Sequence, residues 1–161
     1  MLNASRVGER ADNVYRVLVA DAASETLATF ERALLCCPRF ELQHTVGSIS
    51  ELVSYLAAAG NFIDNPYYSE PHLVLLDLHL SGRDSGLEVL KWVQAQPSRQ
   101  YRVVVLSRTV CEAECERVYA LGADGFMSKP TSVDDTIIAL TRIKHWLNSS
   151  LDVEPFEFSA A

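Results

Sequence analysis

The sequence has little that would place the protein in a membrane, in a secretory pathway or on a nucleic acid. No apolar run approaches the roughly 18 residues that cross a bilayer. The N-terminus is polar and has no apolar segment typical of a secretory signal. Lys and Arg number 14 against 21 Asp and Glu, a net charge of −7, whereas nucleic-acid-binding proteins favour basic surfaces. We therefore expect a cytoplasmic protein with no membrane segment that binds no nucleic acid.

Cysteine is also scarce, and its spacing does not indicate a metal centre. The four cysteines include the adjacent pair Cys36 and Cys37, which cannot easily bridge each other, and no C-x-x-C pair exists. Cys111 and Cys115 would share one face of a helix, but tetrahedral zinc takes four ligands and no His or Cys cluster stands nearby. We interpret these residues as reduced thiols.

What the chain does contain is an alternation of short apolar runs and longer amphipathic segments. With 161 residues, 48% hydrophobic and 22% charged, it is long enough for one soluble domain. Three of the apolar runs are rich in Val and Leu without polar alternation, which is typical of strands buried on both faces of a parallel sheet. The runs are Tyr15–Ala20, Phe40–Val46, Leu73–Leu76, Val103–Leu106 and Gly125–Ser128.

The segments between these runs have helical spacing of apolar residues, most extensively at Val133, Ile137, Leu140, Ile143 and Leu147. Several open with a hydroxyl residue followed three positions later by an acid, the pattern of a capping box. These pairs are Ser48 with Glu51, Ser85 with Glu88, Thr109 with Glu112 and, as a near match, Thr131 with Asp134.

The whole pattern is five βα units in series. It predicts an α/β, doubly wound fold in which five parallel strands, in the order 2-1-3-4-5, are covered by five helices. We place the domain at residues 14–147. Residues 1–13 and 148–161 are predicted to be N-terminal and C-terminal tails.

Four chemically active residues follow the apolar runs of this predicted sheet. Asp21, Asp77, Ser107 and Lys129 each end a different strand, and ligands of open α/β sheets bind beyond the carboxyl ends of the strands. Two close carboxylates repel each other, and Mg²⁺ relieves that repulsion. A carboxylate also attacks phosphorus to give an aspartyl phosphate, and an ammonium and a hydroxyl stabilise the charge on the phosphoryl oxygens.

Four sequence blocks carry a resemblance to a known family. They are VLVAD (17–21), LVLLDLHLSGRDSGLEVL (73–90), VVVLS (103–107) and GADGFMSKP (122–130). In this order they resemble the receiver domain of bacterial two-component response regulators, over about residues 14–147. The resemblance implies that Asp77 accepts a phosphoryl group from a sensor histidine kinase or a phosphotransfer protein in a phosphorelay.

The resemblance also implies a role for each site residue. Mg²⁺ would be held by Asp21, Asp77 and the backbone carbonyl of His79. Lys129 would pair with the phosphoryl group and Ser107 would turn inward to bond it. Phe126 fills the aromatic switch position, which moves when the hydroxyl is drawn in. The bond between Lys129 and Pro130 would be cis, aiming the lysine into the site.

A narrower resemblance concerns the class of regulator. We expect no effector domain after the receiver, which is typical of single-domain regulators such as those paired with bacterial phytochromes. The long connection at residues 61–71 and the ending TRIKHWL are similar to that group. This resemblance implies a phytochrome kinase as the partner and a homodimer joined through the last helix and the nearby strand.

Two departures from the family pattern leave an alternative open. Receivers usually carry two adjacent acids after the first strand, whereas here Ala20 precedes Asp21, so we expect weaker Mg²⁺ binding. The residue after Ser107 is usually small, and here Arg108 either crowds the pocket or contacts the phosphoryl oxygens. The alternative is a degenerate receiver that binds proteins without phosphorylation.

An enzyme is the least favoured reading of the site. Phosphatases with an aspartate nucleophile often place a second acid two residues beyond it, and here that position holds His79. We therefore expect phosphotransfer to Asp77 but no turnover enzyme.

Overall fold

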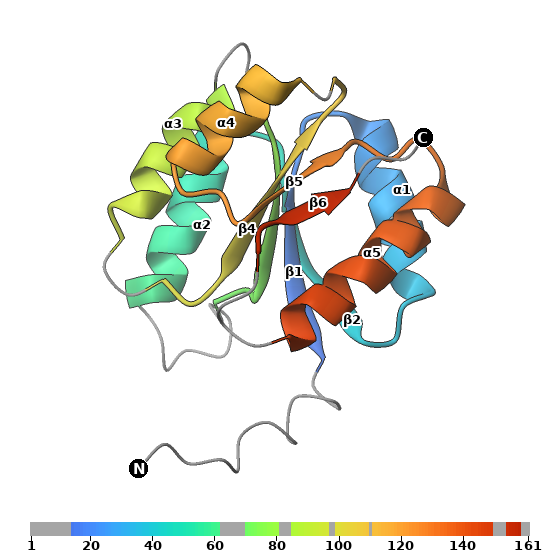
Figure 1. Cartoon of the computed structure of the whole chain (residues 1–161). Coiled ribbons are helices and arrows are strands. Elements are labelled where there is room, and N and C mark those ends of the chain that lie inside the picture. Colours follow the sequence, from blue (N-terminus) through green and yellow to red (C-terminus); the bar gives the residue numbers. More distant parts are fainter. Residues whose placement is uncertain are drawn as a thin grey trace, which may run out of the picture.

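The five apolar runs form parallel strands of one sheet, as Figure 1 shows for the computed structural model. Numbered in chain order, the strands lie in the order 2-1-3-4-5-6, and every neighbouring pair is parallel, which confirms the predicted α/β fold class. The structure describes residues 14–61, 70–80, 85–96, 99–109, 111–149 and 154–158. The first five strands are β1 (Tyr15–Ala20), β2 (Phe40–Val46), β3 (Leu73–Asp77), β4 (Arg102–Ser107) and β5 (Gly125–Ser128).

The burial of the strands follows their composition. All five residues of β3 are buried, and in β4 only Arg102 is partly exposed, because both strands have neighbours and helices on every side. In the outer strand β2 only the first and last residues are buried and the five between them are partly or fully exposed, which fits its more polar sequence.

A sixth strand, β6 (Phe156–Phe158), extends the sheet beyond the five strands predicted. It lies in the segment predicted to be a C-terminal tail and pairs in parallel with β5. Phe156 packs against Trp146 with ring centroids 5.5 Å apart, and the guanidinium of Arg142 lies 5.0 Å from the Phe158 ring centroid. These contacts explain how three residues hold a place at the sheet edge.

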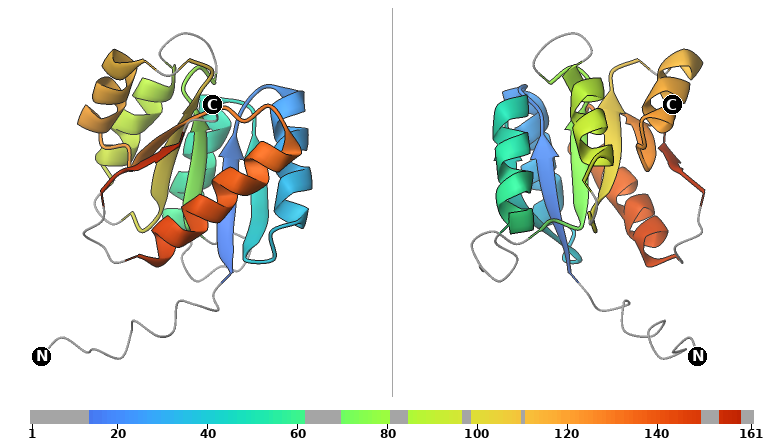
Figure 2. Two further views of the ribbon diagram at one scale, coloured as in Figure 1. Left: turned by 45° about the vertical axis from the view of Figure 1, so that its right-hand side comes forward. Right: turned by 90° about the vertical axis from the view of Figure 1, so that its left-hand side faces the viewer.

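Helices cover both faces of the sheet, so that it is enclosed between two layers. In the two views of Figure 2, α1 and α5 lie on one face and α2, α3 and α4 lie on the other. Among the described residues, no helix is long and apolar enough to cross a membrane. The helices are α1 (Ser24–Leu35), α2 (Ile49–Asn61), α3 (Ser85–Gln94), α4 (Glu112–Ala120) and α5 (Val133–Asn148).

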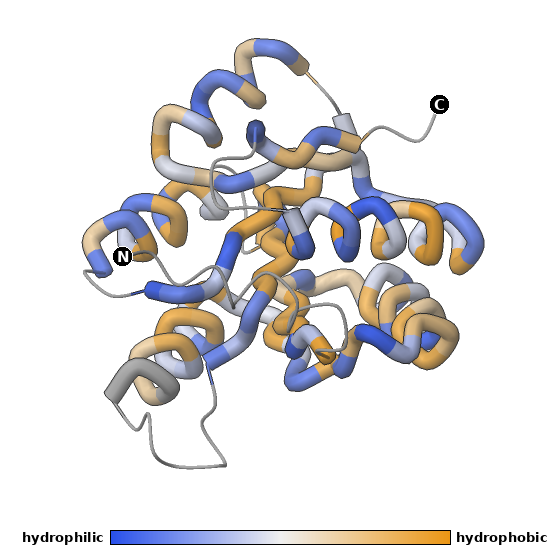
Figure 3. Tube along the Cα trace, turned by 60° about the horizontal axis from the view of Figure 1, so that its bottom comes forward, coloured by the Kyte–Doolittle hydropathy of each residue, from blue (hydrophilic) through white to orange (hydrophobic). Residues whose placement is uncertain are grey.

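The sheet separates two hydrophobic cores, because successive residues of a strand point to opposite faces. In β1, Val17 and Val19 belong to the core under α1 and α5, whereas Leu18 and Ala20 belong to the core under α2, α3 and α4. Figure 3 shows the hydrophobic residues concentrated along the central strands, with hydrophilic residues on the outer sides of the helices.

The helix starts agree only in part with the predicted capping boxes. At α2, the Ser48 hydroxyl accepts a hydrogen bond from the Glu51 N–H (3.2 Å), as predicted. The prediction for α4 is wrong: the helix begins at Glu112, and its N-cap Cys111 makes no side-chain cap bond. At α5 the N-cap is Ser132, one residue after the predicted Thr131.

The end of α4 sets the path into β5. Gly122 has a φ of 91°, a left-handed conformation in which a residue without a Cβ is favoured. Its N–H bonds the Tyr119 carbonyl, and the Ala123 N–H bonds the Val118 carbonyl. This Schellman pattern ends the helix where the sequence places its glycine.

Candidate functional site

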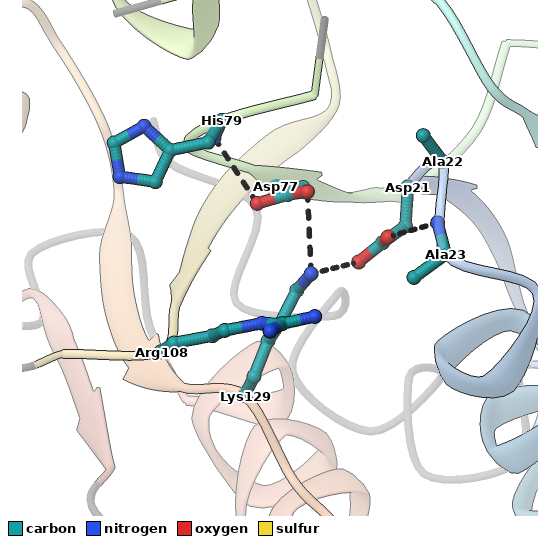
Figure 4. A pocket seen from close by; sticks show the side chains of 7 residues that line it. All are labelled: Asp21, Ala22, Ala23, Asp77, His79, Arg108 and Lys129. Atoms are coloured by element: carbon teal, nitrogen blue, oxygen red, sulfur yellow. Dashed lines mark hydrogen bonds and ion pairs between the residues drawn. The ribbon is translucent and has the colours of Figure 1, made fainter. Parts of the chain in front are cut away.

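Three charged residues meet at the carboxyl ends of the strands. Asp21 directly follows β1, Asp77 is the last residue of β3, and Lys129 directly follows β5. They share a pocket of about 230 Å³, shown in Figure 4. The pocket is lined by Asp21, Ala22, Ala23, Asp77, His79, Arg108 and Lys129.

Lys129 joins the two carboxylates of the pocket. Its Nζ lies 2.7 Å from Asp21 Oδ2 and 3.2 Å from Asp77 Oδ2. The three side chains are 8%, 0% and 10% exposed, so this is a largely buried group of three charges. One ammonium serves two carboxylates, which leaves the group with one excess negative charge.

The second oxygen of each carboxylate is held by the backbone. Asp21 Oδ1 accepts a hydrogen bond from the Ala23 N–H (2.8 Å), and Asp77 Oδ1 accepts one from the His79 N–H (3.1 Å). Both bonds run from residue i+2 back to the aspartate, the local turn that aspartate side chains favour. Each carboxylate is thus oriented so that its Oδ2 faces the lysine (Figure 4).

The route of Lys129 into the pocket corrects one expectation. No peptide bond among the described residues is cis, so the bond between Lys129 and Pro130 is trans. The lysine still reaches the pocket because the strand ladder continues past β5. The Lys129 N–H donates to the Ser107 carbonyl (2.8 Å), which fixes the backbone beside β4.

Ser107 ends its strand where predicted, but its hydroxyl does not line the pocket. Ser107 Oγ donates to the Thr109 carbonyl (2.9 Å) and accepts from the Thr109 N–H (3.3 Å). Glu114 Oε2, on the first turns of α4, lies 3.5 Å from the same oxygen. The hydroxyl is therefore engaged by the β4–α4 connection and not by the charged group.

Phe126 lies inside the core. It is 2% exposed and belongs to the hydrophobic cluster on the side of α2, α3 and α4. Its partner across the strand pair is Val105, two residues before Ser107. The predicted switch residue is therefore close in the sheet to the end of β4, while its side chain is packed as core.

The donor set of the pocket suits a hard divalent cation. Asp21 Oδ2 is fully buried and makes no hydrogen bond of acceptable geometry, although Lys129 Nζ lies 2.7 Å away. Carboxylate and carbonyl oxygens are the protein ligands that Mg²⁺ prefers. Because Ala20 is fully buried and apolar, only two carboxylates are available. Within the described ranges, no group of three or more His, Cys, Asp or Glu could hold a metal.

Sequence reasoning missed two features of the site. The backbone N–H groups of Ala23 and His79 orient the carboxylates; an aspartate at a strand end, followed by a turn, was the available signal. The contact of Glu114 with Ser107 had no sequence signal, because it depends on where α4 starts. The imidazole of His79 points away from the two carboxylates in Figure 4, so only its backbone faces them.

The fold and the pocket together define a doubly wound α/β domain with two aspartates and a lysine at its strand ends. The family model described as the response regulator receiver domain matches residues 40–143. This match covers more than half of the chain, and the protein belongs to this receiver family of two-component response regulators.

Solved structures with the same fold include regulators of light signalling. The phosphorylated cyanobacterial phytochrome response regulator RcpA aligns with a TM-score of 0.68 and 22% identity over 87% of this chain and 99% of its own. RPA3017, which acts in red light signalling of R. palustris, aligns with a TM-score of 0.72 and 20% identity over 87% and 99%. The Mn²⁺-bound response regulator Rcp1 aligns with a TM-score of 0.63 and 22% identity over 84% and 96%.

Proposed function

We propose that this receiver domain accepts a phosphoryl group on Asp77 from a sensor histidine kinase or a phosphotransfer protein. The observation that carries the proposal is the buried group in which Lys129 contacts both Asp77 and Asp21. Family membership supports phosphoryl acceptance in general. The geometry favours Asp77 as the acceptor, because Asp21 is fully buried whereas the Asp77 side chain is partly exposed in the pocket.

The chain's own residues have definite tasks in this transfer. A carboxylate oxygen of Asp77 attacks phosphorus, and the bond from phosphorus to the donor breaks with its electron pair leaving on the donor, a histidine nitrogen in the kinase. Lys129 Nζ is already 3.2 Å from Asp77 Oδ2 and neutralises charge on the transferred oxygens. The His79 N–H keeps the attacking carboxylate oriented during the approach.

We infer that Mg²⁺ assists this transfer, held by Asp21, Asp77 and the backbone carbonyl of His79. The buried Oδ2 of Asp21, which makes no hydrogen bond of acceptable geometry although Lys129 Nζ lies 2.7 Å away, supports this assignment. When bound, the ion supplies positive charge for the phosphoryl oxygens. Rcp1, a neighbour in fold, is Mn²⁺-bound, which favours the same chemistry here. Two carboxylates without a third predict weak binding.

The choice of partners is a further part of the proposal. The likeness to regulators whose names refer to phytochrome and red light supports a phytochrome histidine kinase as the donor. We also propose a homodimer as the assembled form, on the resemblance of the sequence to single-domain regulators. A cytoplasmic location is supported by the four free cysteines, since disulfides are rare in that compartment. We propose no turnover activity, because the residue two beyond Asp77 offers a backbone N–H and not an acid.

A second function, a binding module that works without phosphorylation, is favoured by two observations. Ala20 is a buried apolar residue where receivers usually carry an acid. The Ser107 hydroxyl is bonded to Thr109 and is directed toward α4. Both features would weaken the effect that phosphorylation in the pocket has on the surface that partners recognise.

Incubation with acetyl phosphate and Mg²⁺, followed by intact-mass measurement, separates the two functions. We expect one added phosphate on the wild type and on Asp134→Asn, an exposed aspartate in the first turn of α5. We expect none on Asp77→Asn. Equal labelling of wild type and Asp77→Asn would refute the acceptor assignment. An unlabelled wild type that also gives no amide-shift response to beryllofluoride at millimolar Mg²⁺ would favour the binding module.

A further inference from the structure

The pocket contains a second cation that the charged group does not use. Arg108 follows the last residue of β4 and lines the same pocket as Asp77 and Lys129 (Figure 4). The residue is exposed, and none of the described carboxylates forms an ion pair with it. By comparison, Arg99 pairs with Asp124 at 3.0 Å. Arg108 is thus a guanidinium at the pocket wall whose hydrogen-bonding capacity is not used by the residues that the structure describes.

The charge balance of the pocket indicates that this guanidinium can neutralise a bound phosphoryl group. Two carboxylates face one ammonium, and Lys129 is already shared between Asp21 and Asp77 at 2.7 and 3.2 Å. A phosphoryl group replaces the single charge of a carboxylate with about two negative charges. Ala20, buried and apolar, cannot contribute a further metal ligand. The phosphorylated pocket therefore needs positive charge that Lys129 alone does not supply.

We propose that Arg108 is a phosphoryl-binding residue, which donates two hydrogen bonds to the oxygens of the group transferred to Asp77. A guanidinium is planar, stays charged and fits a phosphate with two parallel N–H donors, which an ammonium cannot do. The inference rests on the proposed function, because it assigns a further contact to the same phosphoryl group. It makes Arg108 a source of positive charge in a pocket where the acid missing beside Asp21 weakens Mg²⁺ binding.

The transfer itself is unchanged by this contact. The new bond joins phosphorus to an Asp77 oxygen, and the electron pair of the broken bond leaves with the donor, which is acetate when acetyl phosphate is used. Arg108 neither gives nor takes a proton. Its effect is to bind two of the outer oxygens before and during transfer, so it should act on donor affinity as well as on the rate.

The test compares Arg108→Gln, which keeps much of the side-chain length without charge, with Arg108→Lys, which keeps the charge without the planar fork. Arg32→Gln, an exposed arginine on α1, is the control for the loss of one positive charge. Two quantities are measured: the acetyl phosphate concentration that gives half-maximal labelling rate, and the apparent Kd of beryllofluoride at fixed Mg²⁺, followed by amide shifts.

For Arg108→Gln we expect both quantities to rise about 10-fold, in line with one charge-assisted pair of hydrogen bonds. Arg108→Lys should lie between this variant and the wild type, and Arg32→Gln should stay within about twofold of the wild type, as expected for a remote surface charge. Values for Arg108→Gln equal to or below those of the wild type would overturn the proposal. Full activity of Arg108→Lys would overturn the two-bond contact.

A failure of the proposed function would look different. In that case the wild type itself takes no phosphate, or Asp77→Asn is labelled as well as the wild type. Urea unfolding guards against a folding artefact. Because Arg108 is exposed, the midpoints of its two variants should coincide with that of the wild type.

Discussion

The site consists of a charged half and a switch half at the same end of the sheet, and only in the charged half do the side chains contact one another. The charged half (Asp21, Asp77 and Lys129) meets across three strands, with the lysine in contact with both carboxylates. The switch half (Ser107 and Phe126) is held by other contacts: the hydroxyl bonds Thr109, and the ring is buried in the core. Strand topology brings the backbones of all five residues to one region. The orientation of each side chain depends instead on the interactions that the side chain itself makes.

The difference lies in the range of the forces that each side chain obeys. Opposite charges in a poorly solvated pocket attract over several ångströms, so Lys129 reaches both aspartates from a different strand. A hydroxyl gains only from a partner at hydrogen-bond distance, and the backbone of Thr109 is the nearest one for Ser107. An aromatic ring is stabilised most by burial. Phe126 is buried in the core on the side of α2, α3 and α4, and this burial does not depend on the charged pocket.

The largest effect on stability should come from truncating the buried ring of Phe126. Phe126→Ala should cost about 3–5 kcal/mol of unfolding free energy, because a ring that is 2% exposed leaves a cavity. Phe126→Leu, the control, should cost much less, since it keeps most of the apolar volume. Urea unfolding at fixed pH measures both. A loss of unfolding free energy below about 1 kcal/mol for the alanine variant would mean that the ring is not packed in the core. The contrast between the charged half and the switch half would then be wrong.

Removal of Lys129 should break the charged half with a somewhat smaller effect. Lys129→Met should cost about 3 kcal/mol without metal, because the fully buried Asp21 carboxylate loses the cation that lies 2.7 Å from it. Mg²⁺ should restore part of this loss, since a divalent cation relieves the repulsion between the two aspartates. Urea unfolding with Mg²⁺ or with chelator measures the difference.

Lys91→Met is the matched control for the lysine. Lys91 pairs with Glu88 on the surface of α3, where the two side chains are 59% and 69% exposed, so its loss should cost less than about 1 kcal/mol. If Lys129→Met were no more costly than this control, the buried charged group would not stabilise the fold as described.

Most of the fold could be predicted from the sequence, because the central strands are buried on both faces and read as unbroken apolar runs. The sixth strand could not. Phe156 and Phe158 are only two aromatic residues in an acidic segment, and they are held at the sheet edge by the Trp146 ring and the Arg142 guanidinium. Such contacts join α5 to the segment that follows it, and the spacing of apolar residues in that segment does not predict them.

The candidate site shows the same limit at the scale of side chains. Strand ends predicted which residues approach one another, and Asp21, Asp77 and Lys129 do so. The orientation of Ser107 depended on the start of α4, whose N-cap Cys111 lies two residues later than the predicted cap at Thr109. That shift leaves the Thr109 backbone free to bond the serine, so a small error in a helix start changes the site.

Removal of the Ser107 hydroxyl should sharpen the separation between the halves. Ser107→Ala should cost about 1 kcal/mol, the worth of its bonds to Thr109, and should leave the Mg²⁺ dependence of stability unchanged. Ser54→Ala, on the exposed face of α2, is the control and should lie within about 0.5 kcal/mol of the wild type. A change in Mg²⁺ dependence as strong as that of Lys129→Met would show the two halves to be one unit.

The smallest effect tests whether pH acts on the fold away from both halves. His72 precedes β3, at the opposite end of that strand from Asp77, and its Nδ1 accepts a hydrogen bond from the Arg16 N–H (2.8 Å). Burial, and secondarily the charge of Arg16, lower the pKa of His72 below the ordinary histidine value of 6.5. The unfolded chain therefore takes up this proton at a higher pH than the folded protein does.

Stability from His72 should be fully present above pH 6.5 and should be lost as the pH falls through the lowered pKa of the folded state. His72→Asn keeps an acceptor near Nδ1 and cannot titrate, so its unfolding free energy should decline less between pH 7 and pH 5 than that of the wild type. Parallel urea titrations across this range measure the slope. Because the residue is remote from the pocket, the slope difference should be the same in Lys129→Met; a difference that disappears there would tie this end of the sheet to the charged half.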